Sequence, residues 1–162
     1  MKVPSKKVEL SSTFSPSEIM KILKKNVQKK RSVNDFASST PVYKYFEGEF
    51  SWGKFKIKRA VKHGNAFIPE IIGELKKSDS GTKILLEFKM NKLTFALFII
   101  WFAISLFYFL LILFTNDINS LPLVDLLLSV GFIGFGFIII CIIYPIELKK
   151  DLIQLKKISN IV

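Results

Sequence analysis

A row of lysines is the feature of this sequence best suited to binding a partner through charge. Lys54, Lys56 and Lys58 stand at every second position, and the residues between them are apolar. This period-two pattern is typical of a strand with one charged and one buried face. Ammonium groups on a flat strand attract phosphate, whether in lipid headgroups or in nucleic acid. The row therefore predicts a basic docking surface for an anionic partner.

Arg59 follows the row but falls in phase with the apolar residues Phe55 and Ile57. An arginine on an apolar strand face must pair with a carboxylate, extend to water or line a wet cleft. Two interpretations stay open: an arginine held by carboxylates or backbone carbonyls at the strand end, or an anion contact for a headgroup or a partner carboxylate. With a second basic cluster upstream, the predicted lipid or partner contacts are Lys54, Lys56, Lys58, Arg59, Lys29, Lys30 and Arg31.

Groups for enzymatic or metal chemistry are few and scattered. The chain has one cysteine, Cys141, and one histidine, His63, so we expect neither a disulfide framework nor a metal site. It has no glycine-rich phosphate loop and no G-x-S-x-G motif. The sequence therefore predicts a protein that is not an enzyme and holds no cofactor. The carboxylates of the predicted strands show no evident pairing and are expected to be exposed: Glu47, Glu49, Glu70, Glu74 and Glu87.

The elements that would position these residues begin with a strand and a helix. Alternating polar and apolar residues over 8–14 predict a short half-buried strand. Ser15, Pro16 and Glu18 then supply an N-cap, a proline at the first helical position and a capping box. The basic residues up to Arg31 are expected at the far end of this helix.

Four further strands are predicted in the remainder of residues 1–92. They cover residues 43–50, 54–61, 71–75 and 84–90, and short turns separate them. Strands joined in this way form an antiparallel β-meander, with one face packed on the helix and the lysines on the other. We therefore expect a basic cytoplasmic α+β domain over residues 1–92.

Two segments without charge follow this domain, at residues 93–114 and 126–144. Each has roughly the 20 apolar residues that cross the hydrocarbon layer of a bilayer. Neither shows the polar stripe that a helix packed on the core of a soluble protein turns toward water. They predict a transmembrane helical hairpin over residues 93–144.

Charge on the flanks of the hairpin predicts its orientation. The turn at residues 115–121 is acidic, whereas lysines precede the first span and follow the second. Lysine and arginine concentrate on the cytoplasmic side of membrane helices. We expect a multi-pass protein of the inner (cytoplasmic) membrane with both termini cytoplasmic. The polar N-terminus has no apolar core of a signal peptide, so none is expected.

Small and aromatic residues suggest how the spans pack. Trp101 and Ser105 share one face of the first span, and Gly131 and Gly134 share a face of the second. Small residues let helices approach closely. One of these faces is expected to close the hairpin, and the other to contact a protein partner or a second copy.

The tail over residues 145–162 is predicted to be an amphipathic helix. Its apolar residues fall on one stripe with lysines around it, as expected for a helix at an interface. The helix could lie in the membrane interface or fold back onto residues 1–92. We favour folding back, because the meander has only one short helix to cover its apolar face. The stripe consists of Leu148, Leu152, Leu155, Ile158 and Val162.

Part of the chain resembles a known architecture. The glycines and strand motifs at Gly48, residues 55–59, residues 65–69, Gly73 and residues 81–84 are spaced as in a group of small bacterial membrane proteins. Those proteins have a cytoplasmic α+β domain followed by a helical hairpin, and no activity is assigned to them. The resemblance covers roughly residues 8–115 and implies architecture and bacterial origin.

The order strand, helix, meander and terminal helix also resembles the helix-grip (START-like) fold. In that comparison, the hairpin is an insertion before the final helix. The predicted strands are fewer than a full ligand cavity of that fold requires, which leaves a lipid pocket without support from the sequence.

Three functions remain open. The favoured one is a membrane module that docks anionic headgroups or a protein partner, because the net charge is +11 and the charge lies beside the bilayer. The second is a membrane tether for nucleic acid, which is less favoured because only Phe50 and Trp52 lie near the lysine row as possible stacking groups, and Trp52 is in a turn. The third is a helix-grip domain that binds a lipid or another small ligand.

Overall fold

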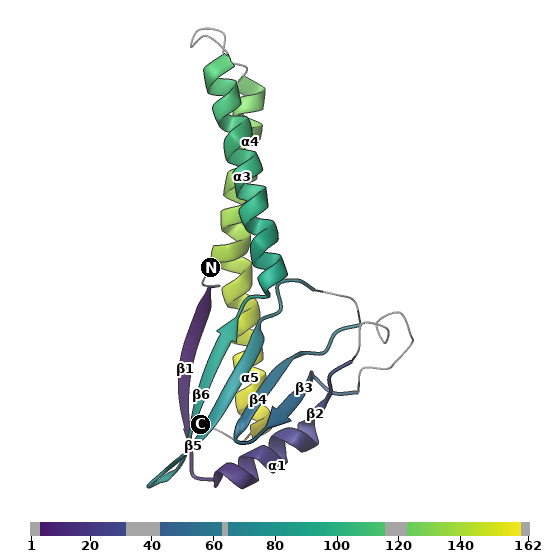
Figure 1. The fold of residues 1–162 in the computed structure, drawn as a ribbon, viewed down its shortest axis with the longest axis vertical. Coiled ribbons are helices and arrows are strands. Elements are labelled where there is room, and N and C mark those ends of the chain that lie inside the picture. The colour runs from purple at the N-terminus through teal and green to yellow at the C-terminus, as the bar shows by residue number, and fades with distance from the viewer. Residues whose placement is uncertain (1–3, 32–42, 63–64, 116–122, 160–162) are drawn as a thin grey trace. The chain divides into compact units, whose positions relative to one another are not determined.

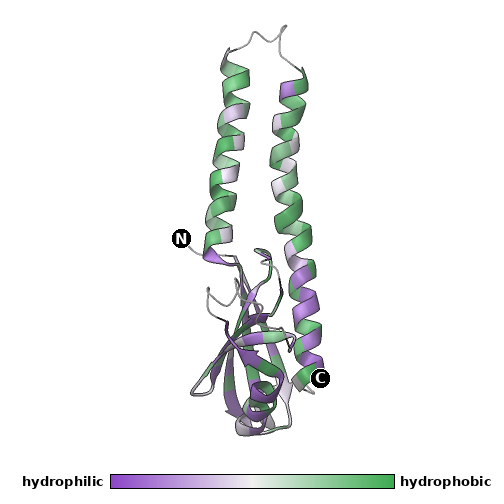
Figure 2. Ribbon diagram, turned by 90° about the vertical axis from the view of Figure 1, so that its right-hand side faces the viewer, coloured by the Kyte–Doolittle hydropathy of each residue, from purple (hydrophilic) through white to green (hydrophobic). Residues whose placement is uncertain are grey.

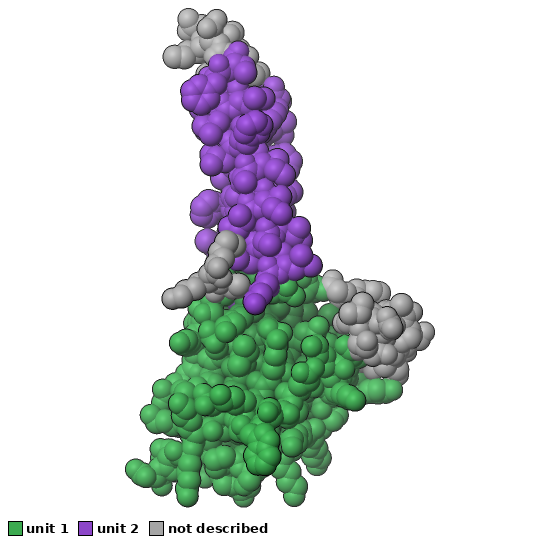
Figure 3. Space-filling model, in the orientation of Figure 1, with its two compact units in different colours: residues 1–91, 147–162 green, residues 92–146 purple. Residues whose placement is uncertain are grey.

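The computed structural model describes residues 4–31, 43–62, 65–115 and 123–159. These residues form two compact units, which Figure 3 colours separately. Unit 1 consists of Met1–Asn91 together with Glu147–Val162, and unit 2 is Lys92–Ile146. His63 and nearly all of the predicted acidic turn lie outside the described residues.

Unit 1 is built on a six-stranded mixed sheet, so the predicted α+β class is confirmed (Figure 1). The predicted four-stranded meander is confirmed by β3 to β6, and the sheet extends beyond it at both edges. β1 pairs antiparallel with β6, and the short β2 pairs parallel with β3 at the opposite edge. The strand order is β1-β6-β5-β4-β3-β2. The strands are β1 (Ser5–Ser12), β2 (Val27–Lys29), β3 (Phe46–Ser51), β4 (Lys54–Arg59), β5 (Glu70–Ser78) and β6 (Gly81–Lys89).

The helix α1 (Pro16–Asn26) begins as its capping residues predict. The Ser15 hydroxyl accepts from the Glu18 N–H at 3.3 Å, and the Glu18 carboxylate accepts from the Ser15 N–H at 2.8 Å. Such a capping box satisfies two backbone donors at the helix start.

The end of α1 differs from the prediction. Val27 is extended and buried, and it starts β2 instead of continuing the helix. A β-branched side chain fits a strand well, and pairing with β3 satisfies the backbone of Val27–Lys29. Lys29, Lys30 and Arg31 therefore do not belong to the helix.

The strands alternate between two unlike faces. On one face, which we call the covered face, lie buried residues such as Phe46, Ile71 and Phe88, whose exposed surface is 0%. The helix α1 and the described part of α5 (Tyr144–Ser159) that belongs to unit 1 supply further buried side chains, including Ile19 and Leu155. The opposite face, which we call the open face, carries the lysine row and most strand carboxylates.

The predicted amphipathic tail corresponds to α5. Its residues from Glu147 onward belong to unit 1 together with the sheet. Leu148 and Leu155 are buried, and Leu152 is half-buried. The side chains of one helical stripe therefore complete the core of unit 1, which is the folded-back arrangement.

Unit 2 contains two apolar helical segments that pack on each other (Figure 2). They are α3 (Lys92–Thr115) and α4 (Leu123–Ile138), which continues through η2 (Ile139–Ile143) into α5. Both helices are long and apolar enough to cross a membrane by length and composition. The wider turn at η2 precedes Pro145, whose ring nitrogen has no proton to donate to the preceding helical turn.

Candidate functional site

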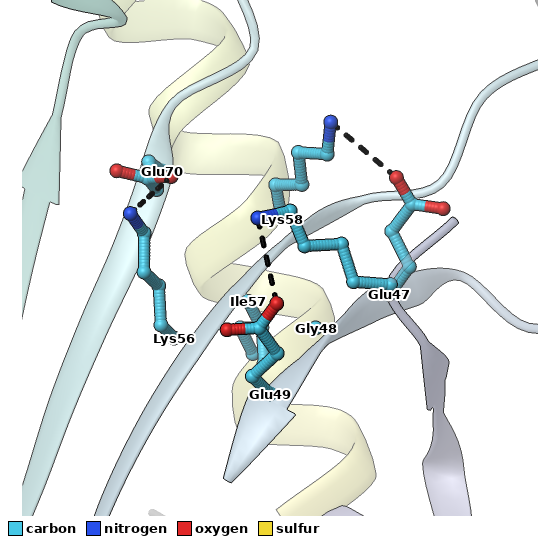
Figure 4. A pocket seen from close by; sticks show the side chains of 8 residues that line it. Glu47, Gly48, Glu49, Lys56, Ile57, Lys58 and Glu70 are labelled. Atoms are coloured by element: carbon cyan, nitrogen blue, oxygen red, sulfur yellow. Dashed lines mark ion pairs between the residues drawn. The ribbon is translucent and has the colours of Figure 1, made fainter. Parts of the chain in front are cut away.

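The lysine row lies on the open face as predicted, but each lysine has a carboxylate partner. Lys54 lies 3.8 Å from Glu74 on β5, and Lys56 lies 2.9 Å from Glu70 on the same strand. Lys58 reaches Glu47 on β3 at 3.4 Å. Figure 4 shows the last two pairs across the strands. The charge of the row is therefore balanced within the sheet.

The other carboxylates of the open face are paired as well. Residues that are opposite or diagonal in neighbouring strands, or two apart on one strand face, come close enough for such pairs. The strand carboxylates were expected to be exposed, and Glu47 contradicts that expectation because its side chain is 1% exposed. The remaining pairs are Glu9 with Lys83 at 2.9 Å, Glu49 with Lys30 at 3.4 Å and Glu87 with Lys89 at 3.0 Å.

Hollows on the open face are small or shallow. One hollow of about 10 Å³ lies between Gly48 and the paired lysines (Figure 4). A wider groove of about 410 Å³ is floored by Ile72 and Leu85 and bordered by charged side chains. The described residues that line either hollow bring no histidine, cysteine or serine together for catalysis.

Glu47 is the exception among the strand carboxylates, because it is buried. Its side chain is 1% exposed, and Arg31, itself 6% exposed, donates to it at 2.6 Å. A second guanidinium nitrogen of Arg31 donates to the Val61 carbonyl at 2.7 Å. A buried ion pair of this kind fixes the end of β2 against β3 and β4. Arg31 thus serves the fold in this structure, apart from any headgroup contact.

Arg59 lies on the covered face and joins β4 to α5. Its Nε donates to Asp151 at 2.8 Å, and its Nη2 lies 2.7 Å from Glu147, one helical turn earlier. The guanidinium also lies over the Tyr45 ring at 5.6 Å, and the Tyr45 hydroxyl donates to Asp151 at 3.3 Å. We call Tyr45, Arg59, Glu147 and Asp151 the Arg59 cluster. Of the two interpretations of Arg59, the structure has the one in which carboxylates hold it.

The two acids of the Arg59 cluster differ electrostatically. Burial raises the pKa of Asp151, and hydrogen bonding to Arg59 only partly offsets that effect. A hydrogen bond from Lys150 and the nearby Arg59 lower the pKa of Glu147. Asp151 is fully buried, and its second oxygen has no partner among the described residues. The cluster therefore fastens the helix to the sheet at the cost of one poorly satisfied carboxylate.

Part of the surplus positive charge of unit 1 lies on its helices. All charged residues except Lys92, Asp117 and Asp125 fall in unit 1, which gives it 23 basic and 11 acidic residues and a net charge of +12. Within the described residues, no ion pair involves six lysines of α1 and α5, which we call the helix lysines. They are Lys21, Lys24, Lys25, Lys149, Lys156 and Lys157.

The predicted packing residues of the hairpin separate into two groups. Trp101 faces α4, because its indole N–H donates to the Phe132 carbonyl at 3.3 Å. Ser105 instead donates to the carbonyl of Trp101 within its own helix. A Cβ on Gly131 or Gly134 would meet nothing within 4 Å, so these glycines do not close the hairpin.

Gly136 makes the close approach that the sequence left unassigned. A Cβ there would come within 2.9 Å of the Phe102 ring. Phe102 also packs edge-on against Phe137. A glycine under an aromatic ring lets two helices come close, so Gly136 closes the hairpin together with the Trp101 face, and a partner contact for Gly131 and Gly134 stays a prediction.

The sequence carried a signal for part of the Arg59 cluster. Asp151 interrupts the apolar stripe between Leu148 and Leu155, and a carboxylate in such a stripe requires a buried partner. Arg59 is likewise a charged residue in phase with the apolar residues of its strand. Pairing these two opposite charges would have predicted the contact between α5 and β4.

No protein-family model matches the chain, and no curated protein or solved structure matches it either.

Proposed function

We propose that this protein is a non-enzymatic module, anchored in a membrane by its helical hairpin, that docks anionic lipid headgroups at the cytoplasmic face of the same membrane. The observation that carries this proposal is the distribution of charge in unit 1. The lysine row is paired with carboxylates, whereas the helix lysines have no such partners within the described residues. The proposed docking surface is thus the helix lysines, and the lysine row is secondary.

The short connection between unit 1 and the first apolar helix favours lipid over nucleic acid as the partner. β6 ends at Lys89 and α3 begins at Lys92, so two residues connect the sheet to the first apolar helix. A connection this short keeps headgroups at a high effective concentration near the basic unit. Each lysine near an anionic surface gains about 1 kcal/mol, and the attraction extends over a Debye length of about 8 Å in physiological salt.

Lysine reactivity in bilayers tests the docking surface. The full chain is placed in nanodiscs of either anionic or zwitterionic lipid and treated with an amine-acetylating reagent, and acetylation at each lysine is measured by mass spectrometry. We expect the helix lysines to react severalfold more slowly in anionic discs, because headgroup phosphates cover them. High salt should abolish the difference, since it screens exposed charges.

The paired lysines provide an internal control in the same sample. Lys54 and Lys56 should react at similar rates in both kinds of disc, because their partners lie within the sheet. Equal rates for the helix lysines in the two lipids would refute headgroup docking. Stronger protection by added duplex DNA than by anionic lipid, at physiological salt, would instead support the nucleic-acid tether.

The orientation required by this proposal can be tested separately. A reporter that is active only outside the cytoplasm, fused after Ile118, is expected to be active. The same reporter at either terminus should be silent, because lysines flank both spans on the terminal side. An active terminal fusion would contradict a hairpin with both ends in the cytoplasm.

A further inference from the structure

The sheet of unit 1 has one end from which the chain passes to both apolar helices. β6 ends there at Lys89, and α3 begins at Lys92. The end of β4 lies at the same level, because the first residue of β5 pairs with both Lys58 and Lys89. Arg59, the last residue of β4, binds Glu147, where the chain returns from unit 2 to unit 1. We call this end of the sheet the hairpin end.

β1 also begins at the hairpin end, where it carries two exposed lysines. Ser5 pairs with Lys89, and Lys6 and Lys7 follow it along the strand. A rise of about 3.4 Å per residue keeps both lysines within about 7 Å of this end. Neither forms an ion pair within the described residues, although Lys7 lies opposite Glu87, which binds Lys89. Both ammonium groups therefore remain available to a partner.

The hairpin end carries more positive than negative charge. Its strand acids are already bound, since salt bridges within the sheet engage Glu47, Glu70 and Glu87. The acids of α5 at this end belong to the Arg59 cluster. Lys62 after β4 and the helix lysine Lys149 near the start of α5 are exposed, and neither forms an ion pair in the part of the chain that the structure describes. An anionic surface would therefore be attracted to this end.

The opposite end of the sheet, which we call the turn end, holds the turn between β5 and β6. Lys76 and Lys77 lie near this turn, and both are exposed without an ion pair among the described residues, although Asp79 lies in the turn. Along β5, Lys76 lies six residues from Glu70, which is about 20 Å. Electrostatic attraction in physiological salt falls off over a Debye length of about 8 Å. Equal charges at the two ends would therefore differ greatly in their attraction to a surface at the hairpin end.

We propose that unit 1 meets the membrane at its hairpin end and that Lys6 and Lys7 bind the phosphates of anionic headgroups in the membrane that holds the hairpin. The inference rests on the proposed function and adds the end of the sheet and the residues that contact lipid. Two chain connections, residues 90–91 and the start of α5, tie this end to helices that are long and apolar enough to cross a membrane. Each lysine within a Debye length of anionic headgroups strengthens binding about fivefold, and the lysines of the turn end lie outside that range.

Fluorescent labels at the two ends test this orientation. Cys141 is the one cysteine of the chain, so Cys141→Ala provides a background without thiols. Ser5→Cys then places a bimane label at the hairpin end, and Ser80→Cys places one in the exposed turn between β5 and β6. Each full-length variant enters nanodiscs that contain a fixed fraction of lipid with a nitroxide quencher on its headgroup. We expect the label at residue 5 to be quenched severalfold more strongly in anionic than in zwitterionic discs, and the label at residue 80 to stay unquenched in both.

Matched charge variants test the two lysines. Lys6→Gln with Lys7→Gln should weaken docking about fivefold for each lysine removed, and the extra quenching in anionic discs should fall accordingly. Lys76→Gln with Lys77→Gln removes the same charge from the turn end and should leave quenching unchanged. All four side chains are exposed, so neither pair of changes removes a core contact. Equal effects of the two pairs would contradict a local site.

The remaining outcomes separate this inference from the proposed function. Quenching at residue 80 in place of residue 5 would set the turn end against the lipid and overturn the inference. Equal quenching at residue 5 in both lipids, with the helix lysines still protected in anionic discs, would refute binding by Lys6 and Lys7 and leave headgroup docking intact. Equal quenching together with unprotected helix lysines would refute docking itself.

Discussion

Replacing Arg59 with methionine is expected to lower the free energy of unfolding of unit 1 by about 3–5 kcal/mol, the usual result of removing one partner of a buried ion pair. Arg59 is 15% exposed and holds two carboxylates of α5, of which Asp151 is fully buried. Without the guanidinium, Asp151 keeps a buried charge whose remaining hydrogen-bond donor among the described residues is Tyr45. Hydrogen exchange measured by mass spectrometry should show the loss as faster exchange over residues 147–159.

Two variants separate the lost ion pair from a general loss of packing. Lys150→Gln removes an exposed partner of Glu147 and should cost less than about 1 kcal/mol. The triple variant Arg59→Met, Glu147→Gln, Asp151→Leu replaces the charges by neutral side chains, which often restores stability. We expect it to recover most of the protection of α5. Failure of the triple variant, with the same exchange as Arg59→Met alone, would contradict an electrostatic cause.

The Arg59→Met defect should depend on pH in a defined direction. The pKa of Asp151 is already raised by burial, and loss of Arg59 raises it further. When a carboxyl has a higher pKa in the folded than in the unfolded chain, protons favour the folded state as pH falls through the folded pKa. The defect should therefore be smaller at about pH 5 than at about pH 7.5. A defect that grows on acidification would argue that Asp151 is not the group left uncompensated.

Local sequence patterns predicted the elements of unit 1 well where residues close in sequence decide the structure. The capping box of Ser15 and Glu18 marked the start of α1, and the alternation around Lys56 marked β4. The failure came at Val27, where basic helix-forming residues suggested a longer helix. Pairing with β3, a partner some twenty residues later, decides that end, and local propensity does not report such pairing.

At the candidate site, too, features set within one strand were predicted and features set by pairing between strands were not. Period two placed Lys54, Lys56 and Lys58 on one face correctly, because that periodicity is a property of a single strand. Their charge balance depends on Glu47, Glu70 and Glu74 in neighbouring strands, and only the register brings these groups together. The helix lysines were visible in the sequence as a solvated face. Their contribution to the surplus charge of unit 1 followed only once the sheet pairs were known.

The largest error of the sequence analysis concerns Glu47, and it leads to the second strong prediction. Glu47 and Glu49 lie two residues apart on β3 and share the open face. The side chain of Glu49 is 64% exposed and pairs with Lys30, whereas that of Glu47 is 1% exposed and pairs with the buried Arg31. Both have the same alternating context in the sequence, and only the fold brings the buried Arg31 against one of them.

Glu47→Ala is therefore expected to cost about 3–5 kcal/mol of folding free energy, because it leaves the Arg31 guanidinium buried without its carboxylate. Glu49→Ala removes an exposed pair from the same strand face and should cost between about 0 and 1 kcal/mol. Thermal unfolding of the full chain in mild detergent, with hydrogen exchange over β2 and β3, gives the comparison. The pair Arg31→Met with Glu47→Leu should restore much of the loss, since apolar side chains then fill the same space. Similar costs for Glu47→Ala and Glu49→Ala would show that the buried ion pair does not hold the edge of the sheet.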